Sequence, residues 1–140
     1  MKYYGLLICI LGWCSPIAPS LAQSTLKPVM PRFAPDPQVY RGTTDPNTGT
    51  NCQGMPTTPP GHILTIERPM SSLSLRVFAA SPVTIKVRGK EGTQCRSGRN
   101  PEILGAWSAG KYEIWIGAVN GDRITYELSL SEASQPEEQK

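Results

Sequence analysis

Few side chains in this 140-residue chain are suited to acid–base or nucleophilic chemistry. The single histidine, His62, stands in a proline-rich approach to an apolar segment. A Ser-His-Asp triad would need a serine on a sharp turn such as GxSxG, and the sequence has no such motif. His62 is therefore predicted to lie at the edge of a strand and to have no catalytic role.

Paired carboxylates would permit a second chemistry, the hydrolysis of a glycosidic bond. Glu113 and Glu127 fall at outward positions of two expected strands, and they would share one face if these strands were neighbours. Outward charges on a sheet normally serve solubility. Phosphate-binding glycine loops and metal-ligand clusters do not occur in the sequence. We therefore predict no catalytic residues, and a hydrolase is the weakest of the functional alternatives.

Basic side chains gather in one stretch of the sequence and are candidates for binding. They are Lys86, Arg88, Lys90, Arg96 and Arg99, with Glu91 as the acidic residue among them. Such an excess of positive charge could attract an acidic polysaccharide, lipid headgroups or an acidic protein face. The alternative is that these are solvated charges on the outer face of a strand and the loop after it. Nucleic acid is not expected, because no aromatic residues alternate with the basic ones.

The N-terminal segment, up to Ala22, has the features of a cleaved secretory signal. Lys2 precedes a short apolar run, and the small residues Ser20 and Ala22 fit the site of a signal peptidase. A lipoprotein signal at Cys14 is the alternative, but Trp13 stands where a small residue is needed. No later stretch is apolar enough to span a membrane. We expect a secreted or periplasmic protein, and loss of Lys2 would lower its net charge from +3 to +2.

Removal of this signal would leave two cysteines, Cys52 and Cys95. Two cysteines in an oxidising compartment most simply form one disulfide. The chain-entropy model credits a loop of this length with about 4 kcal/mol of stabilisation. The alternative is a pair of catalytic or metal-binding thiols, but the sequence offers neither a CxxC spacing nor nearby histidines.

The elements that must position these residues are β-strands. From His62 to Ser131, apolar and polar residues alternate repeatedly, which is typical of half-buried antiparallel strands. The expected strands lie within 62–68, 73–77, 82–89, 109–117 and 123–131. The breaks between them contain turn residues, and Asn120-Gly121 is a strong hairpin signal. The fold class is therefore all-β, as a small antiparallel β-sandwich or jelly roll.

Two segments of different composition border this region. Residues 23–60 hold eight prolines among Gly, Thr, Asn and Asp, which predicts an extended and largely irregular segment. The last residues, 133–140, are predicted to be a polar tail. The expected organisation is thus a signal peptide at 1–22, a Pro-rich segment at 23–60, the sandwich at 61–132 and the tail.

Trp115 has an unexpected place in the strand 109–117. Because Tyr112 and Ile114 are expected to face the core, Trp115 must face the opposite side of the sheet. The residues expected on its face are Lys111, Glu113 and Phe78. There the ring could stack on a sugar or anchor a protein partner. The alternative, which we favour, is that the proline-rich segment, held by the disulfide, covers Trp115.

A set of residues between positions 100 and 117 follows a known family pattern. The set is Asn100, Pro101, Ile103, Gly105, Trp107, Gly110, Tyr112, Trp115 and Gly117. With its surroundings, from Cys52 to Glu132, it resembles the bacterial pre-peptidase C-terminal (PPC) domain. The resemblance implies a compact antiparallel β-sandwich, often an appendage of secreted proteases and other exported enzymes. It implies no catalytic machinery, and therefore no peptidase activity.

The chain departs from this family in a feature that concerns calcium. Relatives often carry acidic residues after the second cysteine, and these can contribute to a calcium site. At these positions the chain has Arg96, Ser97, Gly98 and Arg99. Calcium takes six to eight oxygen ligands, usually with several carboxylates. We expect no metal and no cofactor, and the weak alternative is a partial calcium site at Glu91, Glu102 and Asp122.

These observations favour a non-enzymatic exported module that binds a polysaccharide, a cell surface or a protein partner. The candidate binding residues are Trp115, Lys86, Arg88, Lys90, Arg96 and Arg99. The alternative is a purely structural or accessory secreted domain without a ligand site, in which the aromatic residues are buried and the charges dispersed.

Overall fold

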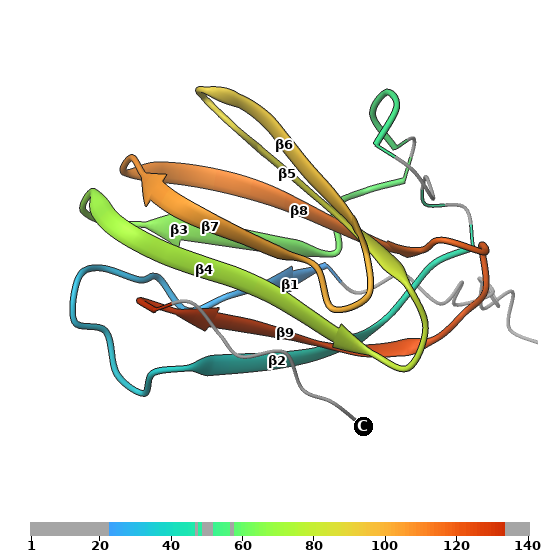
Figure 1. Ribbon diagram of the computed structural model, residues 1–140. Coiled ribbons are helices and arrows are strands. Elements are labelled where there is room, and N and C mark those ends of the chain that lie inside the picture. The colour runs from blue at the N-terminus through green and yellow to red at the C-terminus, as the bar shows by residue number, and fades with distance from the viewer. Residues whose placement is uncertain (1–22, 47, 49–51, 57, 134–140) are drawn as a thin grey trace, which may run out of the picture.

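In the computed structural model, residues 23–46, 48, 52–56 and 58–133 are described, and they form two sheets packed as a sandwich (Figure 1). The five-stranded sheet has the order β1 (Ser24–Thr25), β3 (His62–Ile66), β8 (Gly110–Ala118), β5 (Val83–Gly89) and β6 (Gly92–Gly98). The four-stranded sheet has the order β2 (Gln38–Thr43), β9 (Thr125–Ser131), β4 (Met70–Ala79) and β7 (Glu102–Trp107). Apart from β1 and β3, paired strands are antiparallel. The predicted all-β sandwich is confirmed.

The predicted signal peptide and the end of the predicted tail, residues 134–140, lie outside the described residues. Within the described part of the chain, no helix has the length and apolar character needed to cross a membrane.

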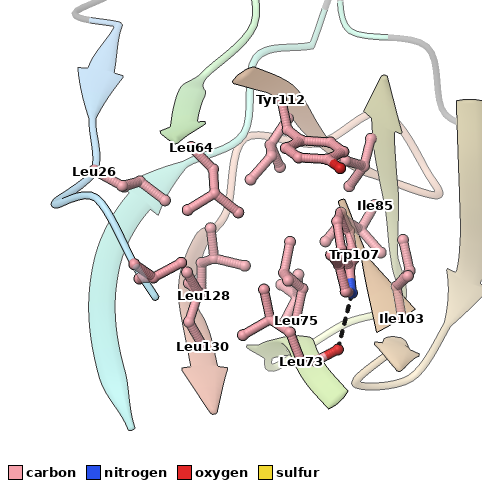
Figure 2. Close-up of a cluster of buried hydrophobic side chains, with 14 of the residues drawn as sticks. Leu26, Leu64, Leu73, Leu75, Ile85, Ile103, Trp107, Tyr112, Leu128 and Leu130 are labelled. Atoms are coloured by element: carbon pink, nitrogen blue, oxygen red, sulfur yellow. Dashed lines mark hydrogen bonds between the residues drawn. The ribbon is translucent and has the colours of Figure 1, made fainter. Parts of the chain in front are cut away.

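Apolar side chains at alternate strand positions fill the space between the sheets (Figure 2). Leu73 and Leu75 of β4 face Ile85 of β5, and all three are fully buried. Trp107 is also buried, and its Nε1 donates to the carbonyl oxygen of Leu73 at 3.0 Å, so its polar atom is satisfied. Its ring meets Tyr112 edge to face, with 5.0 Å between the centroids. The period-two pattern thus located the core correctly.

The proline-rich segment is more regular than predicted. It contains β1 and the six-residue strand β2, and β2 pairs with β9 along its whole length. The segment also places Leu26 and Val29 in the core. The sequence pattern hides β2 because its inward positions are Gln38, Tyr40 and Gly42, which do not form an apolar series. The sandwich therefore begins well before residue 61.

The hairpin predicted at Asn120-Gly121 is wrong, because β8 and β9 belong to different sheets. The residues still make a tight turn: Gly121 has φ 79° and its N–H donates to the carbonyl oxygen of Ala118 at 3.0 Å. Thr44 then holds the connection, since its Oγ1 accepts the N–H of Ile124 at 2.9 Å. The turn chemistry is local and could be predicted, whereas the sheet that the next strand joins depends on the rest of the fold.

Candidate functional site

Trp115 lies on the outer face of the five-stranded sheet, yet it is only 4% exposed. Lys86 of β5 is its neighbour in the sheet, and Cys95 of β6 is the next residue in the same row. This row crosses the sheet beneath two segments of the proline-rich region, 52–56 and 58–60, which we call the covering loop.

Three contacts hold the covering loop on this row. The predicted disulfide joins Cys52 to β6, with 5.6 Å between the two Cα atoms. Lys86 Nζ donates to the carbonyl oxygen of Gly54. Trp115 Nε1 donates to the carbonyl oxygen of Thr58 at 2.9 Å. The covered arrangement favoured from the sequence is therefore the one that forms, and neither Lys86 nor Trp115 presents an open surface.

Arg88 carries a further charge on this face, and it is also engaged within the chain. Its guanidinium lies 5.2 Å from the centroid of the Trp115 ring, within the range of a cation–π interaction. Its Nη2 is 2.8 Å from Oε1 of Glu113 on the adjacent strand. Both interactions orient the arginine along the sheet and offset its charge.

The other basic candidates are strung along the β5–β6 hairpin instead of meeting in one cluster. Lys90 lies in the turn, Arg96 lies in β6, and Arg99 follows the far end of that strand. All three are exposed. At roughly 3.3 Å per residue, Lys90 and Arg99 are separated by roughly 20 Å or more. The stretch expected to be a loop is itself a strand, so neighbours in sequence become spread along an edge.

The two carboxylates considered for catalysis do not share a face. Glu113 is on β8 of the five-stranded sheet, whereas Glu127 is on β9 of the four-stranded sheet. Both point outward, so the core separates them, and the prospect of neighbouring strands is wrong. Each carboxylate is also paired, Glu113 with Arg88 and Glu127 with Arg41 at 3.1 Å.

The three acidic residues considered for a calcium site lie in different parts of the fold. Glu91 lies in the β5–β6 turn and Asp122 in the connection between β8 and β9. Glu102 accepts a hydrogen bond of 2.6 Å from the hydroxyl of Ser74 on the adjacent strand. Among the described residues, no group of three or more His, Cys, Asp and Glu could hold a metal ion.

His62 begins β3 but points into the sandwich, where it is only 2% exposed. Its Nε2 lies 2.7 Å from the hydroxyl of Tyr126 on the opposite sheet. Burial lowers the pKa of His62 from 6.5 to about 4 and raises the pKa of Tyr126 from 10.0 to about 12. Both side chains are therefore neutral at pH 7 and joined by a hydrogen bond. The sequence predicted the strand end but not this burial.

A small cavity of about 280 Å³ adjoins the His62–Tyr126 pair at one end of the sandwich. The covering loop contributes Thr58 to its lining, and Thr48 and Trp115 contribute as well. Nδ1 of His62 is buried without a hydrogen-bond partner in the described part of the chain.

A larger open groove of about 760 Å³ lies at the same end, on the four-stranded sheet. Arg41, Glu127 and Phe78, from β2, β9 and β4, form one row across the outer face of this sheet. Arg99 and Asn100 add polar groups from the loop after β6. Phe78 was expected beside Trp115, but it lies on the opposite face of the sandwich. Sequence reasoning missed the groove because Arg41 falls in the segment predicted to be irregular.

Comparison with known proteins gives few matches. No family model matches the chain. A stretch of 62 residues is 39% identical to an uncharacterized protein of Synechococcus elongatus, covering 42% of this chain and 46% of that protein. The match thus spans less than half the length of this curated relative.

Among solved structures, the chain is similar to the pre-peptidase C-terminal domain of a collagenase from Bacillus anthracis. The TM-score is 0.48 and the sequence identity 12%, over 79% of this chain and 97% of that domain. That domain belongs to the family that the sequence of this chain resembles.

Proposed function

We propose that this chain is a non-enzymatic, exported accessory module that binds an acidic polysaccharide in the groove of the four-stranded sheet. The observation that carries the proposal is an open groove of about 760 Å³ that combines the aromatic ring of Phe78 with the guanidinium groups of Arg41 and Arg99. The groove residues come from strands and a tight loop of the sandwich, so the backbone positions them firmly.

The chemistry of these groups suits a sugar acid. An aromatic ring offers an apolar face to the C–H side of a pyranose, and a guanidinium can hold a carboxylate with two parallel hydrogen bonds. Arg41 forms an ion pair with Glu127, whereas Arg99 forms no ion pair within the described residues. Arg99 is therefore expected to provide the main contact with the anion, and Phe78 the contact with the ring.

Two further observations support a module that is exported and not catalytic. The Cys52–Cys95 disulfide suits an oxidising compartment, in keeping with the signal expected at the N-terminus. The two carboxylates considered for catalysis lie on opposite faces of the sandwich, Glu113 on one and Glu127 on the other. The PPC resemblance of the sequence likewise implies an accessory domain.

Affinity electrophoresis in gels containing polygalacturonate or dextran tests this proposal. We expect polygalacturonate, but not dextran, to retard the oxidised protein. Arg99→Ala should weaken the binding about tenfold or more, because a hydrogen bond to a charged group contributes roughly 1.5–3 kcal/mol. Phe78→Ala should weaken it as well.

Lys111→Ala is the matched control, because Lys111 is exposed on the opposite face of the sandwich. It removes the same charge as Arg99→Ala and should leave the retardation unchanged. Equal losses in Arg99→Ala and Lys111→Ala would point to non-specific charge attraction and contradict the site. No retardation at all would favour the structural role without a ligand.

A further inference from the structure

β6 forms one edge of the five-stranded sheet and runs for seven residues, Gly92–Gly98. It pairs with β5 on one side, and no other strand of the described chain lies along its outer side. An edge strand of this kind presents alternate backbone N–H and C=O groups that are not paired within the sheet. Its side chains are exposed or half-buried throughout, so solvent reaches the whole edge.

The edge carries its own protection at one point. Arg96 folds back along β6, and its Nη1 donates to the carbonyl oxygen of the preceding residue, Cys95, at 2.8 Å. Long cationic side chains on an edge strand discourage indiscriminate pairing. A strand that added here would have to draw the guanidinium of Arg96 away from this carbonyl.

The charge along the edge is strongly one-sided. Lys90, Arg96 and Arg99 mark its beginning, middle and end, and all are exposed. Glu91 is the acidic residue in the same stretch. The neighbouring Arg88 does not add to the excess, because it pairs with Glu113. An extended partner complementary to this edge would therefore carry carboxylates at intervals along its length.

We propose that the outer edge of β6 receives an extended acidic peptide of a partner protein as an additional strand. A carboxylate of the peptide takes the guanidinium of Arg96, which frees the Cys95 carbonyl for a backbone N–H of the peptide. Main-chain hydrogen bonds then supply affinity, and the cations supply selectivity, as in other cases of strand addition. A second copy of this chain fits less well, because two β6 edges would bring their own cations together. The peptide would add along the edge of the five-stranded sheet, whereas the polysaccharide groove lies on the four-stranded sheet, and Arg99 borders both surfaces.

Fluorescence anisotropy with a labelled ten-residue peptide of alternating Glu and Val tests the proposal on the oxidised protein. We expect saturable binding and slower hydrogen exchange of backbone amides in β6. The same Glu-Val peptide with every backbone nitrogen methylated keeps the charge but has no N–H group to donate, and it should not bind. A peptide of alternating Lys and Val should not bind either.

On the protein side, Arg96→Glu should weaken binding of the Glu-Val peptide at least tenfold, and Arg96→Gln should have a smaller effect in the same direction. Lys27→Glu is the control, because Lys27 is exposed and follows β1 at the opposite edge of the sheet. Equal affinity for the Glu-Val peptide and its N-methylated form, or unchanged amide exchange in β6, would overturn strand addition. Absence of binding at millimolar peptide would overturn the docking edge altogether.

Discussion

His62 and Tyr126 form a buried polar link between the two sheets. Because the folded state holds the pKa of His62 at about 4 instead of 6.5, it resists protonation that the unfolded chain accepts. Between pH 6.5 and pH 4 the unfolded chain thus binds more protons. The stability conferred by neutral His62 is complete above this window and is lost as the pH falls through it.

The free energy of unfolding should therefore drop by about 3 kcal/mol from pH 7 to pH 4 on account of His62, at 1.36 kcal/mol per pKa unit. Urea unfolding of the wild type and of His62→Gln at both pH values measures this contribution. The variant should be less stable at pH 7 but should lose less stability on acidification, since its side chain does not titrate. Parallel losses in the two proteins would show that other groups cause the acid sensitivity.

For single residues, the sequence predicts on which face of a sheet a side chain lies better than it predicts whether that side chain is buried. Strand alternation placed Trp115 on the outer face, and the covering by the proline-rich segment followed from the disulfide. The sequence places Lys86 among the exposed cations, because the burial of Lys86 depends on a carbonyl oxygen of the covering loop that lies far away in sequence. A charge on an outward strand position is normally solvated, and only the tertiary contact reverses that expectation.

Among the strands, β2 is fitted closely to its neighbour. A Cβ atom at Gly42 would lie 2.4 Å from the hydroxyl oxygen of Tyr126, closer than real contacts allow. The strand therefore needs a glycine where it passes beneath the tyrosine that binds His62. This contact ties an edge strand to the polar link between the sheets.

Gly42→Ala should cost about 1–3 kcal/mol of stability, as overpacking in a core does. It should also displace Tyr126, which a shift of the His62 ring signals in an NMR spectrum would report. Gly105→Ala in β7 is the matched control, because an added Cβ there meets no atom within 4 Å. Equal free energies of unfolding for the two variants would show that the space at Gly42 does not limit the stability of the fold.

Strands differ in how well the sequence revealed them. β3, β4, β5, β8 and β9 direct apolar residues into the core at alternate positions, so apolar and polar residues alternate in the sequence and the pattern is clear. β6 has the sequence GTQCRSG and is exposed along most of its length, so no apolar face marks it. The sequence also hides β2, but for a different reason. This strand has an inward face, and that face consists of polar, aromatic and glycine residues instead of an apolar series. Edge strands such as these are defined by their partners.

For the whole molecule, chain order and spatial order differ greatly. Among the nine strands of the described chain, β5 and β6 are consecutive in sequence and also adjacent in a sheet, whereas the other consecutive pairs are not neighbours. The fold thus depends on contacts between distant segments, which are costly in loop-closure entropy. The Cys52–Cys95 disulfide spans 43 positions and reduces this cost in the unfolded chain.

Replacement of both cysteines, Cys52→Ser with Cys95→Ser, should lower the stability by up to about 4 kcal/mol. The covering loop would then depend on its noncovalent contacts, among them the hydrogen bonds from Lys86 and Trp115. Acrylamide should quench Trp115 more readily in this variant, while buried Trp107 stays protected. A Trp115→Phe background assigns the signal. Unchanged quenching would mean that the loop stays in place without the disulfide.

The covering loop determines which surface differs between the reduced and the oxidised protein. In a reduced chain whose covering loop is displaced, the Trp115 ring and the Lys86 ammonium group would be open to solvent on one face of the sheet. Formation of the Cys52–Cys95 disulfide would fix the covering loop over that surface, so oxidation of the two thiols would also cover the tryptophan. The disulfide would then keep this surface covered, in addition to its contribution to stability.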